Sequence, residues 1–173
     1  METRKILGAA LAWALGATVL GAAETTTPSS TAFGWLKGLS GKWHGKAEWS
    51  GERKGSYELE AVYSATGNGT AVVENLISNG VTTMTSVYHA DGQDLRMTHY
   101  CGAGNQPRLK STEIELAKKM VHFKMIDMTG RQGPHVGEAE VRVVDEDHAT
   151  IFFTFVDGKA PSLERIDLTR DRP

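Results

Sequence analysis

The residues best suited to chemistry are gathered in residues 98–108, which hold a histidine, a tyrosine, the only cysteine of the chain and an arginine. This segment follows an alternating run and contains a Gly-Ala-Gly turn. Loops at strand ends are where a scaffold presents polar groups to a ligand. We therefore predict a site whose members from this segment are His99, Tyr100, Cys101, Asn105, Gln106 and Arg108.

Covalent catalysis is one chemistry that the segment allows. Residues two apart on one strand face, such as His99 and Cys101, have Cβ atoms about 6.5 Å apart, so a thiolate–imidazole contact needs favourable rotamers. Glu74 or Asn105 could orient the imidazole. The simpler interpretation is a small buried cysteine beside a hydrogen-bonded histidine, and we assign no catalytic residue.

Two further chemistries centre on His99. With Cys101 and another His or Glu it could bind zinc, but the paired spacings typical of zinc sites are missing from the sequence. We expect neither a metal site nor a cofactor. With Glu74 or Tyr100, His99 could instead act as general acid or base in a hydrolysis, isomerisation or hydration.

Reversible binding of a small, largely apolar ligand is the function that we favour. Small-molecule sites combine an apolar lining with a few polar groups, and the expected lining is Trp43, Tyr57, Glu74, Met84, Tyr88, Met97 and His99. Asn105, Gln106 and Arg108 would shape its rim, although such amides often only brace a loop. The alternatives are an enzyme acting on such a ligand, and an interaction module with a filled interior.

Strands must position these residues, because the chain from Trp43 onward consists of short alternating runs separated by turn residues. Residues 57–63, 139–143 and 151–155 alternate, and Asn-Gly or Asp-Gly pairs separate several runs. Such pairs are the strongest short-range hairpin signals. About ten strands follow a short helix predicted at residues 31–39, with Thr31 as its cap.

We predict an all-β fold, an antiparallel up-and-down barrel of about ten strands with the short N-terminal helix closing one end. Closure removes exposed sheet edges, and a barrel of this size can hold one small ligand. An open sandwich is the alternative.

The Asp91-Gly92 turn fixes which way the candidate site points. A two-residue turn there predicts four pairs: Ala90 with Gln93, Tyr88 with Leu95, Ser86 with Met97, and Met84 with His99. Side chains alternate along a strand, so His99 and Cys101 should face the interior and Tyr100 the other side. A slip of one residue would invert this arrangement.

Residues 1–23 read as a signal peptide: a basic start, an apolar stretch and small residues before Glu24. An uncleaved membrane anchor is the alternative. Residues 24–30 are then a mobile polar leader, residues 31–173 one barrel domain, and the protein periplasmic or secreted, with no stable membrane span after cleavage. The net charge of −2 does not suit nucleic acid, which requires a clustered basic surface. The oligomeric state is left open.

Two motifs carry a resemblance. Gly41-Lys42-Trp43-His44-Gly45 resembles the Gly-x-Trp opening of lipocalins and other calycins, and the Gly-x-Trp-x-Gly opening of nitrobindin-like barrels. Residues 88–108 resemble the central signature of an uncharacterised family of bacterial lipocalin-like domains, many of them exported; the likeness covers roughly residues 33–170. It implies a β-barrel and no established activity.

The resemblance has two further implications. The Trp should plug one end of the barrel and pack against an arginine of the last strand, Arg165 or Arg170. Nitrobindin-like barrels bind haem through a His on a late strand, but residues 163–169 contain none. Haem ligation of that kind is therefore not predicted.

Overall fold

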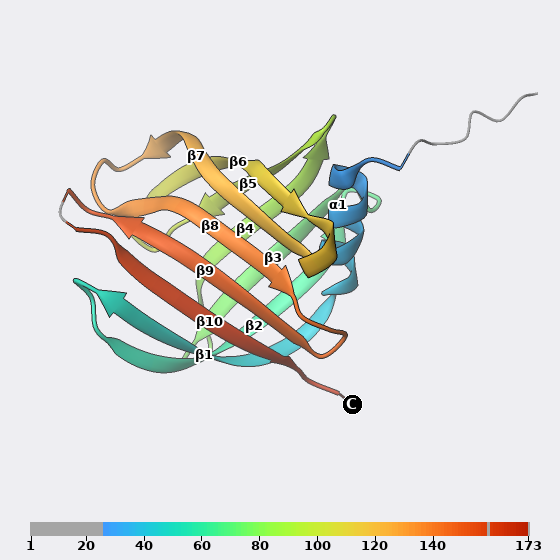
Figure 1. Ribbon diagram of the computed structural model, residues 1–173. Coiled ribbons are helices and arrows are strands. Elements are labelled where there is room, and N and C mark those ends of the chain that lie inside the picture. The colour runs from blue at the N-terminus through green and yellow to red at the C-terminus, as the bar shows by residue number, and fades with distance from the viewer. Residues whose placement is uncertain (1–25, 159, 173) are drawn as a thin grey trace, which may run out of the picture.

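A computed structural model describes residues 26–158 and 160–172, so the predicted signal peptide lies outside the described residues. Ten strands form a closed antiparallel barrel in which every strand pairs with its sequence neighbours and the last strand pairs with the first (Figure 1). The predicted all-β barrel is confirmed. Its elements are α1 (Pro28–Gly38), β1 (Gly41–Gly51), β2 (Gly55–Thr66), β3 (Ala71–Ser78), β4 (Val81–Asp91), β5 (Asp94–Tyr100), β6 (Asn105–Glu115), the 3-10 turn η1 (Leu116–Lys118), β7 (Met120–Gly130), β8 (His135–Val143), β9 (His148–Val156) and β10 (Ser162–Arg170).

The helix begins three residues before the predicted cap. Thr27 is the actual N-cap, because its hydroxyl accepts from the Ser30 backbone N–H at 3.1 Å while the Ser30 hydroxyl accepts from the Thr27 N–H at 2.9 Å. Pro28 occupies the first helical position, where its missing N–H costs nothing. The reciprocal cap therefore draws residues 28–30, predicted as leader, into α1.

Trp43 plugs the end of the barrel that α1 covers. It is fully buried, and its indole N–H donates to the Leu39 carbonyl at 2.8 Å. The Arg170 guanidinium lies 4.2 Å from the ring centroid and donates to the carbonyls of Gly38 and Ser40. Of the two arginines predicted to pack on Trp43, Arg170 does so.

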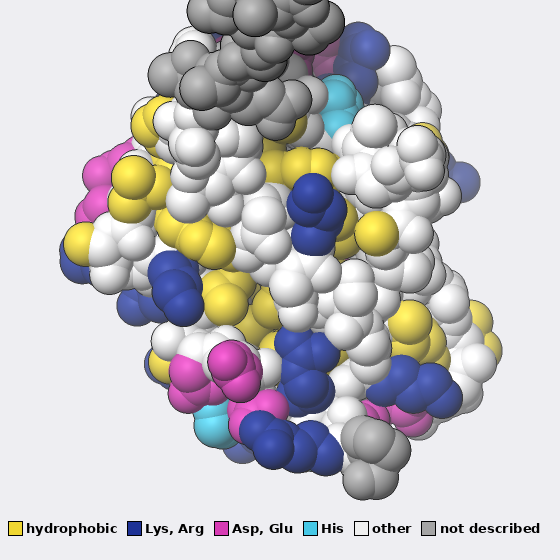
Figure 2. Space-filling model, turned by 90° about the vertical axis from the view of Figure 1, so that its right-hand side faces the viewer, with side chains coloured by type: hydrophobic (Ala, Val, Ile, Leu, Met, Phe, Trp, Pro, Cys, Tyr) yellow, Lys and Arg dark blue, Asp and Glu magenta, His cyan; other side chains and the backbone are white. Residues whose placement is uncertain are grey.

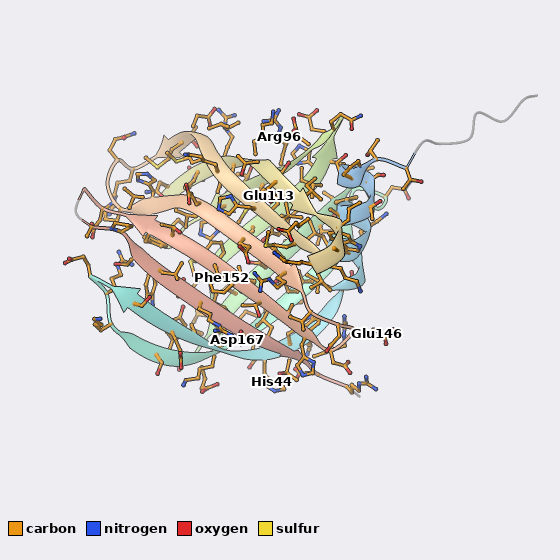
Figure 3. All side chains as sticks on the ribbon, in the orientation of Figure 1. His44, Arg96, Glu113, Glu146, Phe152 and Asp167 are labelled. Atoms are coloured by element: carbon orange, nitrogen blue, oxygen red, sulfur yellow. The ribbon has the colours of Figure 1, made fainter. Side chains whose placement is uncertain are left out.

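Arg165 lies instead on the outer surface, 5.8 Å over the ring of Phe152. Phe152 and Asp167 are labelled among the side chains of this outer face in Figure 3. Side chains alternate between the two faces of a strand, and Arg165 and Arg170 are an odd number of positions apart on β10. Their side chains therefore point to opposite faces. The different parity of the two positions explains why only one reaches Trp43.

The second glycine of the Gly-x-Trp-x-Gly motif is required by close packing of β1 on β10. A Cβ on Gly45 would lie 2.6 Å from both the Asp167 carbonyl oxygen and the Leu168 side chain. Gly41 has φ +134, a conformation that favours glycine. The motif therefore fixes the approach of the two strands that close the barrel.

The β4–β5 hairpin has a different register from the one predicted. Asp91 pairs with Asp94, Tyr88 with Met97 and Ser86 with His99, so the two central turn residues are Gly92 and Gln93. The predicted pairs were wrong by two residues. Because the side-chain period is also two, the predicted faces survive the shift: His99 and Cys101 are buried, and Tyr100 is 50% exposed.

The helix end of the barrel is filled. Phe33, Leu36 and Leu39 are buried against Trp43 and the rest of the core, and Figure 2 views this end, where hydrophobic side chains show between polar and basic groups. No helix in the described part of the chain has the length and apolar character needed to cross a bilayer. The hairpins β1–β2, β7–β8 and β9–β10 gather at the opposite end (Figure 1), which we call the pocket end.

Candidate functional site

A pocket of about 530 Å³ lies at the pocket end of the barrel. Its lining comes from the ends of six strands and the loops after β1 and β5, and consists of Trp49, Arg53, Tyr57, Ser78, Thr83, Met84, Cys101, Gly102, Ala103, Phe155 and Glu164. Pockets for small ligands are usually about 300–1,000 Å³, largely apolar and equipped with a few polar groups. The pocket has these properties.

Two aromatic rings and an arginine form one wall. Trp49 and Phe155 meet edge to face, with centroids 5.5 Å apart. The Arg53 guanidinium lies 4.9 Å from the Trp49 centroid and 4.5 Å from the Phe155 centroid. The Arg53 backbone N–H donates to the Ser162 hydroxyl at 3.0 Å, which ties the β1–β2 loop to β10. This wall combines flat apolar surface with one positive charge.

Glu164 supplies the opposite charge. It lies on β10 beside Trp49 of β1, and its side chain is fully buried. One carboxylate oxygen, Oε1, accepts a hydrogen bond of 2.5 Å from the Tyr57 hydroxyl. Burial raises the pKa of Glu164, whereas the Tyr57 hydrogen bond and the charge of Arg53 lower it. Burial, together with the same hydrogen bond, raises the pKa of Tyr57.

Cys101 lies at the pocket wall where β5 ends. Its Sγ accepts from the Ala103 backbone N–H at 3.5 Å, and burial raises the pKa of its thiol. A raised pKa lowers the thiolate fraction at neutral pH, which is the reverse of what nucleophilic cysteines need. The environment is that of a structural cysteine beside the pocket.

A second buried polar group, in the packed part of the interior, centres on Glu74. Its Oε2 accepts from Tyr88 at 2.7 Å and from Tyr63 at 3.1 Å, and its Oε1 accepts from Ser86 at 3.3 Å. Ser86 also contacts His99 Nδ1 at 3.0 Å. Because the Ser86 hydroxyl donates to Glu74, His99 Nδ1–H donates to Ser86, which leaves Nε2 as the acceptor nitrogen.

Burial is the main cause of the pKa shifts of Glu74 and His99 in this cluster. It raises the pKa of Glu74 to about 7, against the three hydrogen bonds that lower it. It lowers the pKa of His99 to about 4. Both groups are fully buried, and neither lines the pocket.

The predicted site residues are therefore divided among three environments. Cys101 and Met84 line the pocket, as does Tyr57. The packed interior holds Trp43, Glu74, Tyr88, Met97 and His99. His99 and Cys101 share a face of the barrel, but only Cys101 reaches the pocket wall.

The remaining predicted residues serve the barrel's exterior and loops. Tyr100 points outward, and Arg108 forms an exposed bidentate ion pair with Asp127, at 2.5 and 2.7 Å. Gln106 accepts from the Thr129 hydroxyl at 3.2 Å. Asn105 is buried and donates to the carbonyls of Arg131 and Pro134, which is the bracing alternative considered above. None of these four lines the pocket.

Sequence reasoning missed the pocket's most polar members. Glu164 lies on the same face of β10 as the buried residues Ile166 and Leu168. An acidic residue at an inward position of an apolar series was therefore the available signal. Trp49 was likewise in phase with Trp43 and Ala47. Arg53 is in a loop, and no periodicity could have placed it.

The described residues contain no group of three or more His, Cys, Asp and Glu side chains arranged to hold a metal ion. No family model and no curated protein matches the chain.

Solved structures do resemble it. The crystal structure of Rv2717c from M. tuberculosis aligns with a TM-score of 0.61 at 14% identity, covering 82% of this chain and 98% of that one. A protein of unknown function from the DUF3598 family of Nostoc punctiforme aligns with a TM-score of 0.45 at 13% identity, covering 79% of this chain and 49% of that one. At such identity the likeness to Rv2717c concerns the fold alone, and we draw nothing from the second. The lipocalin-like assignment stays a prediction from the motifs.

Proposed function

We propose that the protein reversibly binds a small, largely apolar molecule in the pocket opposite α1, a role of the lipocalin kind. The observation that carries this proposal is the pocket itself: about 530 Å³ lined by aromatic, thioether and thiol groups, with Arg53 and Glu164 as its charged members. A barrel whose interior served only as a core would be filled at both ends. Here the helix end is filled and the other end is not.

The enzymatic alternative rested on His99 as acid or base. His99 is fully buried, and its neighbours are Ser86 and the ring of Phe153, whose centroid lies 5.0 Å from that of the imidazole. A general base must come within hydrogen-bond reach of the proton it removes. Because His99 does not line the pocket, this geometry favours binding over catalysis.

The test is a fluorescence titration with N-phenyl-1-naphthylamine, an apolar dye that brightens in dry surroundings. We expect saturable binding to one site in the wild-type protein. Ala103→Trp places a large ring in the pocket and should weaken the dye's affinity at least tenfold. This is roughly the effect expected when the dye loses its contact with one buried ring of the pocket.

The matched control is Val144→Trp, which adds the same ring at an exposed position outside the pocket. It should bind the dye as the wild type does. Unsaturable binding, or equal affinities for Ala103→Trp and Val144→Trp, would refute the proposal.

A further inference from the structure

One polar atom of the pocket has hydrogen-bonding capacity that the protein does not use. Glu164 Oε2 is buried and has no hydrogen-bond partner among the described residues, whereas Oε1 is held by Tyr57. Buried carboxylate oxygens normally have partners, and leaving one without a donor is unfavourable. Since this oxygen belongs to a pocket residue, a bound molecule can supply the missing donor.

The charge around Glu164 indicates what kind of donor fits. Arg53 is close enough for its charge to lower the pKa of Glu164 and that of Cys101. The positive charge that a buried carboxylate needs is thus already present in the pocket. A cationic ligand would be repelled by Arg53, while a neutral hydroxyl or amide N–H would not.

The walls indicate the shape of the rest of the ligand. Trp49 and Phe155 present rings at an interplanar angle of 70°, and Met84 adds a flexible thioether to the lining of the same pocket. Flat rings pack well on edge-to-face aromatic pairs, and methionine adapts to irregular outlines. A planar apolar body suits this lining.

Resting on the proposed function, we infer that the ligand is an uncharged, flat, apolar molecule that donates an O–H or N–H hydrogen bond to Oε2 of Glu164. Glu164 is then the residue that selects among apolar molecules of similar size. Because Tyr57 already donates to Oε1, Oε2 is the oxygen that is left to accept from the ligand.

Access to Oε2 requires a side chain to move, because Glu164 has no exposed area. Arg53 is the side chain best able to do so. It is half-buried, and its guanidinium lies over the two aromatic rings with no hydrogen bond or ion pair to another described residue. Such cation–π contacts are weak, so a ligand ring can replace one of them.

The experiment compares three naphthalenes of nearly equal size as competitors of N-phenyl-1-naphthylamine at pH 7: 2-naphthylmethanol, its methyl ether and 2-naphthylmethylamine. The alcohol donates without charge, the ether cannot donate, and the amine donates as a cation. We expect the alcohol to bind at least tenfold tighter than the ether, the ratio given by one hydrogen bond to a charged group. We also expect it to bind tighter than the amine.

Substitutions assign the preference to one atom. Glu164→Gln keeps an oxygen for Tyr57 but turns an amide NH₂ toward the ligand, so the alcohol-to-ether ratio should fall to about threefold or below, or reverse. Tyr57→Phe retains the carboxylate and should retain the ratio. Glu48→Gln removes the same charge from the exposed face of β1 and should change nothing.

The outcomes separate this inference from the proposed function. Equal binding of alcohol and ether by a protein that still binds the dye in the pocket would overturn the inference and leave the proposed function standing. A preference that survives Glu164→Gln, or is lost in Tyr57→Phe, would assign donor recognition to another atom. If the amine binds most tightly, the inference that the ligand is uncharged is wrong. Failure of the dye to distinguish Ala103→Trp from Val144→Trp would remove the proposed function itself.

Discussion

Glu74 and Glu164 are both fully buried in the same barrel, yet their surroundings differ. Glu74 accepts from three side-chain hydroxyls in the packed interior, whereas Glu164 accepts from one and borders a pocket. A buried carboxylate with a complete set of donors specifies packing; one with an incomplete set at a cavity retains capacity for a ligand. Burial of a charged group is therefore not itself a sign of a functional site, and the number of its donors is more informative.

The largest expected effect contrasts the tryptophans at the two ends. Trp43→Ala removes a fully buried ring, its hydrogen bond to Leu39 and the surface on which Arg170 stacks. We expect it to lower the free energy of unfolding by about 3–5 kcal/mol. Trp49→Ala, which removes a half-buried side chain from the pocket wall, should lower the free energy of unfolding by about 1 kcal/mol. It should, however, weaken dye binding at least tenfold.

Urea unfolding and dye titration of the two variants measure this contrast. The filled end is predicted to carry stability and the pocket end affinity. Similar losses of stability in both variants would mean that the two ends are equally packed, and the distinction between them would be lost.

An intermediate effect concerns the pH dependence of stability. The pKa of Glu74 is raised to about 7 in the folded protein, above its unfolded value of about 4.3. The folded state therefore holds the proton more tightly, so Glu74 contributes stability at low pH that is lost as the pH rises through about 7. In Glu74→Gln this decline should be missing.

Urea unfolding of wild type and Glu74→Gln from pH 5 to pH 8 tests this directly. The pKa of His99 is lowered by burial, so below about pH 6.5 His99 acts in the opposite direction, and stability falls as the pH falls. That contribution is common to both proteins and cancels in their difference. If the difference between the two proteins does not change with pH, Glu74 does not titrate in this range.

The smallest effect is expected at Arg108. Its ion pair with Asp127 is exposed on both sides, and exposed pairs contribute little to stability. Arg108→Gln should leave the melting temperature and the dye affinity unchanged within error. A clear loss of dye affinity would restore the rim role predicted for Arg108 and weaken the assignment of the site to the pocket end.

Sequence patterns fixed the faces of the strands better than their partners. The β4–β5 register was wrong by two residues, yet His99 and Cys101 still face inward and Tyr100 outward, because a slip of two preserves the parity of alternation. The predicted start of the helix was three residues too late, because the reciprocal cap of Thr27 and Ser30 lies in residues that were predicted to be a leader. Alternation within a strand predicted which way its side chains point. The pairing of β4 with β5 depended on the position of the turn between them, which lies one residue later than predicted.

By itself, the sequence predicted the closed barrel of about ten strands, the inward alternation and a Trp43 plug packed against Arg165 or Arg170 of the last strand, and the structure places Arg170 there. These follow from turn residues, a period of two and a short motif, all local in the chain. Only the tertiary structure decided that His99 belongs to packed interior while Cys101 reaches a pocket, and that Glu164 from β10 meets Tyr57 from β2. Alternation tells which face a residue takes, but its depth along the barrel, and what lies across from it, depend on how the strands stagger when the sheet closes.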